Sequence, residues 1–467
     1  MIKETSRSAV SLAVLAVCAA LVLCGGQAHA AAENSVSPSV VATQKGPPDG
    51  SGYFTLQRLI DVALERNPEI AAAKWDMEAA DSRYDGARAS YWPQFGIEGG
   101  YLRHLDDQRL IAARYNGEPG VFDRDIVRGD VVAKWTLFAG GRQVNDADAA
   151  KKFSEAEKKK FIRTRDELVY SVTALYFSIL GQQKVLASLA FSRQALELNH
   201  MRVAQLYEAQ KAAKVDLLRM DVRLSDLRQT AIREENTLAV QKRALFNLLG
   251  YEAVPADARL EDKASTPLDS LIDKDRLVEA ALQNRPDYQA ALKRVDAQTR
   301  KVASARAGHW PSVSLVGTYG VRYAPRPDDV GKNTEATEDI GSAGVVLSVP
   351  LFEGGRVAAK VREENALLAA AQDRLKKLAL QIRQEVETAA LDATAASERF
   401  KATEKSIEQA KESLRIELLK YELGKGSITD VLDAQSALLQ AETGNCRSCI
   451  DYHISMARLK LATGGSL

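Results

Sequence analysis

The sequence predicts a mainly α-helical protein with a few membrane β-strands, assembled from two tandem copies of one unit. One segment without glycine or proline, Val357–Leu423, begins after LFEGGR and ends in YELGKG. An earlier segment, Gln143–Gln210, is broken only by Gly181, begins after LFAGGR and ends in YEAQKA. The motifs at both ends recur at one and the same offset, which indicates a duplication without net insertion.

These two segments predict long helices at 143–210 and 357–424. A run of this length without a helix breaker favours one continuous helix. At about 1.5 Å per residue each helix is about 100 Å long, deeper than an ordinary globular core. Stretches such as Glu155–Arg165 carry charge on most turns. We therefore expect the helices to form the wall of a tube, with water on its inner and outer faces.

A second pair of segments, Leu59–Tyr101 and Leu277–Tyr319, repeats at a slightly larger offset, and 14 of 43 aligned positions are identical. The two offsets together define the domain organisation, because each repeat contains one segment of each kind. We predict a first repeat at 55–250, a connecting segment at 251–276 and a second repeat at 277–464.

The amino terminus has the pattern of a secretory signal peptide. Basic residues precede the apolar run Ala9–Leu23, and Gln27-Ala28-His29-Ala30 resembles a cleavage site. We predict a signal peptide at 1–30 and a flexible leader, rich in Ser, Pro and Gly, at 31–54. Lipidation of Cys24 stays open as an alternative, although the preceding Leu23 is larger than the residue normally found there.

Four segments change from the helical period to an alternation of apolar and polar residues. We predict strands at about 94–104, 126–137, 312–323 and 340–351. Loops are expected between the members of each pair, at about His104–Asp123 and Ala324–Glu338. Strands of about 10 residues with one apolar face and aromatic residues near the ends are typical of membrane β-barrels. A soluble sheet with one buried face is the alternative.

Four strands are too few to close a barrel, and an open sheet edge is not tolerated in lipid. The barrel must therefore be shared between chains. Two chains would supply eight strands, and three chains would supply twelve.

Helix lengths predict how the chain returns along the long helices. Asp216–Leu249 and Leu277–His309, placed end to end, match the length of one long helix. Asp430–Thr463 and Leu59–Tyr91, placed end to end, match it equally well. We expect the first pair to return along the first long helix and the second pair along the second. Each chain would then present four helical columns.

Composition and motifs argue against an enzyme and against nucleic-acid binding. The formal net charge is only +1, so no strongly charged partner is indicated. No nucleophile elbow, phosphate loop or zinc-hydrolase helix occurs, and the GGR motifs lack the further glycine of a phosphate loop. We predict no catalytic residue, no metal and no cofactor, and we interpret the GGR motifs as bends from barrel to tube.

Cys446, Cys449 and His453 share one face of a predicted helix, at positions i, i+3 and i+7. A metal or redox site is conceivable for this pattern, and an oxidised pair is compatible with an extracytoplasmic location. No second ligand pair lies nearby in the sequence. We interpret these residues as small side chains packed in a helix seam.

With the paired GGR motifs, the duplication and TDVLDAQ at Thr429–Gln435, the chain resembles the TolC-type outer membrane efflux protein family from about Thr55 to Gly464. The resemblance implies a homotrimer in the outer membrane of a Gram-negative bacterium. It implies a 12-strand barrel in outer-membrane lipid and a 12-helix α-barrel extending into the periplasm. It also implies a passive duct that works with a periplasmic adaptor protein and an inner-membrane pump of the RND or ABC type.

The resemblance further implies a periplasmic mouth at the turns farthest from the strands. The two acidic residues that narrow this mouth in the family match Asp430 and Asp433, and rings of carboxylates favour cations. Helix capping is the alternative for Asp430, because it lies at a predicted helix start. A tie between a tyrosine and an acidic residue, which holds the family's mouth closed, matches Tyr421 and Asp216.

A second tie of the family is missing, because Gly426 and Val215 stand where an arginine and its hydroxyl partner are expected. Lys425 is a candidate substitute, and Arg219 stands in the first repeat where Asp433 stands in the second. The residues expected to dock the adaptor are in the two tip turns: Gly424, Lys425, Gly426, Lys211 and Ala212. The first of these turns lacks the family's glycine, so its docking detail is open.

The competing hypothesis is a structural coiled-coil or adhesin-like surface protein with a β-barrel anchor. In that case the apolar heptads should persist along the whole helix, with polar residues on the outer face only. The exported substrate is not readable from the sequence, because drugs, metal ions and secreted polypeptides, including type I secretion substrates, use this scaffold.

Overall fold

The computed structural model describes residues 53–111, 121–255, 259–261, 273–324 and 337–465 of the 467-residue chain. The predicted signal peptide, most of the leader and much of the connecting segment lie outside these residues. The chain divides into two compact units, and the first consists of Met1–Tyr53 with Pro255–Arg259. Everything below concerns the second unit, Phe54–Val254 with Leu260–Leu467.

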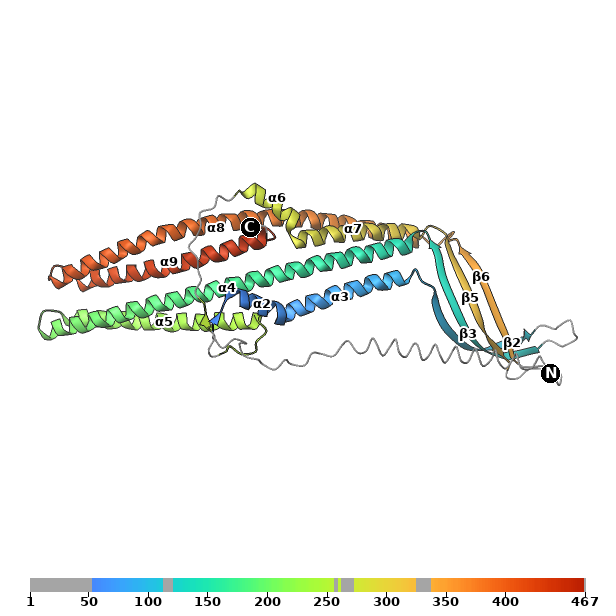
Figure 1. Cartoon of the computed structure of the whole chain (residues 1–467), viewed down its shortest axis with the longest axis horizontal. Helices are drawn as coiled ribbons and strands as arrows, with labels where there is room; N and C mark the ends of the chain where they lie inside the picture. The colour runs from blue at the N-terminus through green and yellow to red at the C-terminus, as the bar shows by residue number, and fades with distance from the viewer. Residues whose placement is uncertain (1–52, 112–120, 256–258, 262–272, 325–336, 466–467) are drawn as a thin grey trace. The chain divides into compact units, whose positions relative to one another are not determined.

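Two helices of 67 residues dominate the second unit, α4 (Arg142–Glu208) and α8 (Arg356–Glu422). Each helix begins one residue earlier than predicted and ends two residues earlier than predicted. Each forms a hairpin with a helix of 35 residues, α5 (Lys214–Leu248) or α9 (Ile428–Ala462). Figure 1 shows the turns of both hairpins at one end of the long helices and the strands at the other end.

Four shorter helices complete the helical part. They are α2 (Leu56–Arg66), α3 (Pro68–Ala89), α6 (Lys274–Asn284) and α7 (Pro286–Ala307). A proline is the first residue of both α3 and α7. Because a residue before proline avoids the helical region, Asn67 and Arg285 adopt extended ψ angles of 125° and 123° and interrupt the helices.

The predicted pairing of the helical columns is wrong. The carboxyl end of α5 meets the start of α3, where the Asn67 side-chain amide donates to the Leu248 carbonyl at 2.9 Å. The carboxyl end of α9 meets the start of α7, where the Arg285 Nη1 donates to the Ala462 carbonyl at 3.3 Å. The column of the first 35-residue helix is thus completed by the amino-terminal segment, and that of the second by α7.

Lengths alone could not decide between these pairings, because α2 and α3 have the same lengths as α6 and α7. The deciding contacts join residues that are far apart in the sequence. Gly250 and Gly464 follow the 35-residue helices with φ of 74° and 72°, and each lies against the backbone of the incoming segment. The short helices α2 and α6 pack beside α4 and α8 instead of extending the columns.

The helices pack through narrow apolar seams. On α8 the buried residues recur at helical spacing and are mostly small: Ile382, Val386, Ala389, Ala390, Ala393 and Ala396. Small residues allow close approach of the neighbouring helices α6 and α9, whose Ala281 and Leu459 are fully buried in the same cluster. Outside these seams the surface of α8 is largely charged, but it also carries exposed apolar side chains, among them Leu367, Leu380 and Leu391.

The four long strands form one antiparallel sheet in the order β2-β3-β5-β6. Their limits are Gln94–Ile111, Val121–Ala139, Ser312–Tyr323 and Thr337–Ser348. The first two are longer than predicted, because a register shift between Arg103 and Gln108 lets pairing continue past the polar residues that suggested a loop. The last strand ends at Ser348, not at 351, since Pro350 has no N–H for the ladder.

One face of this sheet is apolar and exposed. Its large side chains include Phe95, Ile97, Tyr101, Val127, Leu315, Tyr319, Val345 and Leu347. None of the described helices is long and apolar enough to cross a membrane. Among the described residues, strands β2 and β6 each have one edge without a partner strand. A sheet with two open edges and an apolar face requires further copies of the chain to close in lipid.

Candidate functional site at the helical tips

The two tip turns share one backbone conformation. In the first, the Lys211 N–H donates to the Leu206 carbonyl at 2.7 Å, and in the second the Lys425 N–H donates to Lys420 at 2.9 Å. Gln210 and Gly424 occupy the left-handed region, with φ of 60° and 71°. The first repeat therefore makes the same turn without the glycine that normally accommodates this conformation.

The acidic residues at the starts of α5 and α9 act as caps. The Asp430 carboxylate accepts a hydrogen bond from the Ser427 N–H at 3.3 Å, and Asp216 accepts one from the Ala213 N–H at 3.4 Å. The Ser427 hydroxyl also accepts a hydrogen bond from the Thr429 N–H. The capping interpretation of Asp430 is therefore realised in this chain.

Tyr421 lies half-buried close to Asp216. Burial raises the pKa of the Tyr421 hydroxyl, and the negative charge of Asp216 raises it further. Within the described single chain no hydrogen bond joins the two side chains. The structure thus brings the predicted pair together without forming the tie that the resemblance implies.

Asp433 lies in a groove between α5 and α9, and Arg219 lines the same groove. The groove encloses about 420 Å³ and is lined by Val215, Leu218, Arg219, Val222, Arg223, Asp226, Thr429, Leu432 and Asp433. The Arg219 Nη1 donates to the Thr429 hydroxyl at 2.9 Å. Arg223, one turn further along α5, donates to the Ser436 hydroxyl. Two arginines of the first hairpin therefore reach across to hydroxyls of the second.

A third contact joins the hairpins through their long helices, where Arg202 of α4 pairs with Glu422 of α8 at 2.8 Å. Sequence reasoning missed this pair and the bonds made by Arg219 and Arg223. Helical periodicity shows which residues share a face of one helix, but it does not show which residues of another helix they meet. The only hint in the sequence was that Arg219 and Arg223 are one helical turn apart, so that both side chains lie on the same face of α5.

The remaining predicted tip residues have local roles. A side chain at Gly426 would start 3.0 Å from the Lys420 Cβ, so this turn has no room for one. The Lys425 side chain makes no hydrogen bond or ion pair with any described residue, so it does not replace the missing tie in this chain. Ala212 packs against the buried tip cluster, and Lys211 is exposed.

Cys446, Cys449 and His453 lie on one face of α9. Among the described residues, no group of three or more His, Cys, Asp or Glu side chains is arranged to hold a metal ion. Burial raises the pKa of the Cys446 thiol, and neither cysteine is in a disulfide bond. The His453 ring stacks on Phe177 with centroids 4.5 Å apart. These contacts place the cysteine–histidine face in the packing between helices.

The sequence profile of a family described as "Outer membrane efflux protein" matches residues 59–251 and 277–465. The chain belongs to the outer membrane efflux protein family. The two matched ranges correspond to the two copies of the duplicated unit, and together they cover most of the chain.

Curated relatives of known name agree with this family. The chain is 25% identical over 416 residues to the outer membrane protein TolC of Vibrio cholerae, covering 88% of this chain and 90% of that protein. It is 26% identical over 430 residues to OprJ of Pseudomonas aeruginosa, with coverage of 88% and 84%.

Solved structures share the fold. The outer-membrane channel OprN superposes with a TM-score of 0.75 at 22% identity, covering 88% of this chain and 90% of that chain. The CmeC outer membrane channel of Campylobacter jejuni gives 0.74 at 16% identity, with coverage of 88% and 86%. At these identities the likeness concerns the fold alone.

Membership of the family establishes the class of function. The chain is an outer-membrane efflux channel protein of the tripartite type, with its helices in the periplasm. Channels of this type are trimers that work with a periplasmic adaptor and an inner-membrane pump. Three copies of the four-stranded sheet give the twelve-stranded barrel that was expected, and the adhesin hypothesis is not needed.

Proposed function

We propose that the channel is a passive duct whose periplasmic mouth is held closed by contacts between the two hairpins of each copy. The observation that carries the proposal is the pair of α5 arginines bonded to α9 hydroxyls, Arg219 to Thr429 and Arg223 to Ser436. Tyr421 and Asp216 lie close together at the same tips, without a hydrogen bond between them in the described chain. The duct has no catalytic role, because its residues only hold or release the hairpins.

Opening requires the first hairpin to move away from the second. The buried tip cluster, which includes Met220, Leu224, Ile428 and Val431, resists this movement because it would expose apolar surface. The adaptor would supply the opposing free energy by binding the turns at Gly424, Lys425, Gly426, Lys211 and Ala212. The adaptor can shift the equilibrium between closed and open mouth only if it binds the open state more tightly than the closed state.

Charge at the mouth is mixed in this chain. In a trimer Asp430 and Asp433 would form two rings of carboxylates, which favour cations. Arg219 and Arg223 share the groove of Asp433 and offset part of this negative potential. We therefore expect weaker cation selectivity than carboxylate rings alone would give.

The experiment measures single-channel conductance of the purified protein in a planar bilayer, comparing Tyr421→Phe with Tyr207→Phe. Tyr207 is the matched control, because it occupies the corresponding position near the end of the long helix in the first repeat. Loss of the Tyr421 hydroxyl should raise the basal current, whereas Tyr207→Phe should leave it unchanged. An unaltered closed-state current in Tyr421→Phe would refute a gating role for this tyrosine.

A further inference from the structure

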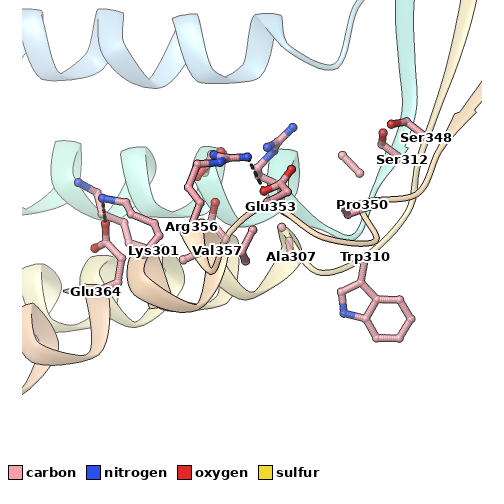
Figure 2. Close-up of a pocket in the computed structure, with 17 residues that line it drawn as sticks. Lys301, Ala307, Trp310, Ser312, Ser348, Pro350, Glu353, Arg356, Val357 and Glu364 are labelled. Carbon is pink, nitrogen blue, oxygen red and sulfur yellow. Dashed lines mark hydrogen bonds and ion pairs between the residues drawn. The ribbon is translucent and has the colours of Figure 1, made fainter. Parts of the chain in front are cut away.

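A second candidate site lies at the opposite end of the long helices from the mouth, where strands turn into helices. A cavity of about 480 Å³ opens there between the starts of α4 and α8, the end of α7, the ends of β3 and β6 and the start of β5. Figure 2 shows the side chains that line it, drawn from these separate elements. The GGR motifs, which the channel function did not explain beyond a bend, form part of its wall.

Two positive helix ends face this cavity. Gly141 and Gly355 precede the first residues of α4 and α8, and neither can supply a side-chain cap. The first turns of both helices contain no acidic residue and begin instead with Arg142 and Arg356. The Arg356 N–H of α8 already donates to the Glu353 carbonyl at 3.1 Å. The start of α4 is therefore the helix end that favours a further negative charge here.

Most of the charged side chains in the cavity are already paired. Arg356 binds Glu353 at 2.6 Å (Figure 2). Lys360 binds Glu364 at 2.8 Å. Burial alone would raise the pKa of Glu364, but hydrogen bonds from Lys360 and Gln298 lower it, so this carboxylate stays ionised. These two pairs neutralise themselves and leave no charge for a ligand.

Arg142 is different, because it has no ion pair with any described carboxylate, including the nearby Asp146. Lys301 also lines the cavity, and its ammonium group lies 5.2 Å from the centre of the Phe153 ring. Two cations thus face the cavity against a single unpaired carboxylate. The local balance is positive.

A buried hydroxyl points to a ligand independently of these charges. Ser304 lines the cavity with only 8% of its surface exposed, and its hydroxyl has no hydrogen-bond partner among the described residues. Some other helical serines of this chain, such as Ser171 and Ser448, donate their hydroxyls to the carbonyl four residues earlier. The Ser304 hydroxyl makes no such bond and stays available to a group in the cavity.

The position of the cavity indicates where the ligand comes from. Ser312 and Ser348 are register partners at its rim. They lie on the polar face of the sheet, together with Thr318 and Ser342, whose hydroxyls are 2.8 Å apart. The opposite face carries the apolar side chains expected to meet lipid. The cavity therefore adjoins the face expected to line the channel.

We propose that this cavity binds a phosphate or carboxylate group of a solute in the channel, held by Arg142, Ser304 and the N–H groups at the start of α4. A phospholipid headgroup has the same phosphate chemistry but would have to reach the cavity from the bilayer. The site is separate from the mouth, so it does not depend on the proposed gate.

The test uses the full-length protein in nanodiscs of phosphatidylcholine, titrated with inorganic phosphate by calorimetry. The wild type should bind phosphate, and Arg142→Gln should bind about tenfold more weakly, the loss expected for one charge-assisted hydrogen bond. Ser304→Ala should weaken binding less. Arg306→Gln is the matched control, because Arg306 lies on α7 close to Ser304 but outside the cavity wall.

Equal phosphate binding by the wild type and Arg142→Gln would overturn the proposal, as would no binding by the wild type. A second arm measures lipid retained by the purified protein after exposure to phosphatidylglycerol, using native mass spectrometry. Retention that depends on Arg142, without phosphate binding, would contradict a solute ligand and assign the source to the bilayer. Thermal unfolding checks that every variant is folded.

Discussion

At the junction between α5 and α3 in the first half, a neutral side chain completes the helix end: the Asn67 amide donates to the Leu248 carbonyl. At the equivalent place in the second half stands a cation, Arg285, only 1% exposed. It donates to the Ala462 carbonyl and pairs with Asp287 at 2.7 Å and Glu385 at 2.6 Å. The same backbone arrangement is thus stabilised by a single amide in one half and by an ion cluster of a buried arginine with two partly exposed carboxylates in the other.

This difference shows which features of the junction the fold requires and which can differ between the two copies. The fold requires a donor for the last carbonyls of the 35-residue helix and a glycine in the left-handed region, and both halves have them. The charge of that donor is free to vary, provided that its partners vary with it. The same freedom appears at the mouth, where Arg219 of one copy corresponds to Asp433 of the other.

The largest expected effect comes from breaking the ion cluster. Arg285→Met leaves Asp287 without its partner and the Ala462 carbonyl without a donor, so we expect a loss of about 3–5 kcal/mol in the free energy of unfolding. Asn67→Ala, the matched change in the first half, removes one hydrogen bond and should cost about 1–2 kcal/mol. Thermal unfolding followed by circular dichroism checks both, and equal losses would contradict the comparison.

The second effect is a dependence of stability on pH that arises at the Arg285 junction and should be absent from the Asn67 junction. Burial would raise the pKa of Asp287, but the hydrogen bond and charge of Arg285 lower it below its ordinary value of 3.8. The ionised carboxylate therefore adds stability above that value, and this stability is lost as pH falls through the lower folded pKa. Unfolding temperatures should fall below about pH 4 in the wild type.

In the Asp287→Asn variant, the part of the stability loss at low pH that comes from Asp287 should be absent. Glu69→Gln, a change at the equivalent place in the first half, is the control and should keep the wild-type profile. If Asp287→Asn follows the wild-type curve throughout the acid range, the ion cluster does not contribute to acid sensitivity.

The smallest effect sharpens the comparison of the two tip turns. Gln210 has φ of 60° where the second half has Gly424. Because the left-handed region is strained for a residue with a Cβ, Gln210→Gly should stabilise the protein by about 0.5–1 kcal/mol. Denaturant unfolding measures the change, and Gly424→Ala should shift stability in the opposite direction. A destabilised Gln210→Gly variant would show that the glutamine side chain supports the turn.

Much of the helical frame was predictable from the sequence. The two long helices follow from the absence of helix breakers, and the break at Asn67 follows from the proline after it. The number of strands follows from the change to a period of two. These features depend on neighbours along the chain, which the sequence shows directly.

Features that depend on distant neighbours were predicted less well. The column pairing was wrong because two segments of equal length competed, and the side chains of Asn67 and Arg285 decided between them. The ends of β2 and β3 were missed because cross-strand pairing continued past polar residues. At the mouth, the reach of Arg219 and Arg223 to α9 depends on how two hairpins pack, which no periodicity within one helix reveals.

The central claim is that α5 arginines hold the two hairpins together at the mouth. The most direct measurement is the basal single-channel conductance of the double variant Arg219→Ala and Arg223→Ala in a planar bilayer. Arg228→Ala is the matched control, because it lies on the same helix and makes no hydrogen bond or ion pair with described residues. The account predicts a current several-fold above wild type for the double variant and a wild-type current for the control. A double variant that stays closed like the wild type would contradict it.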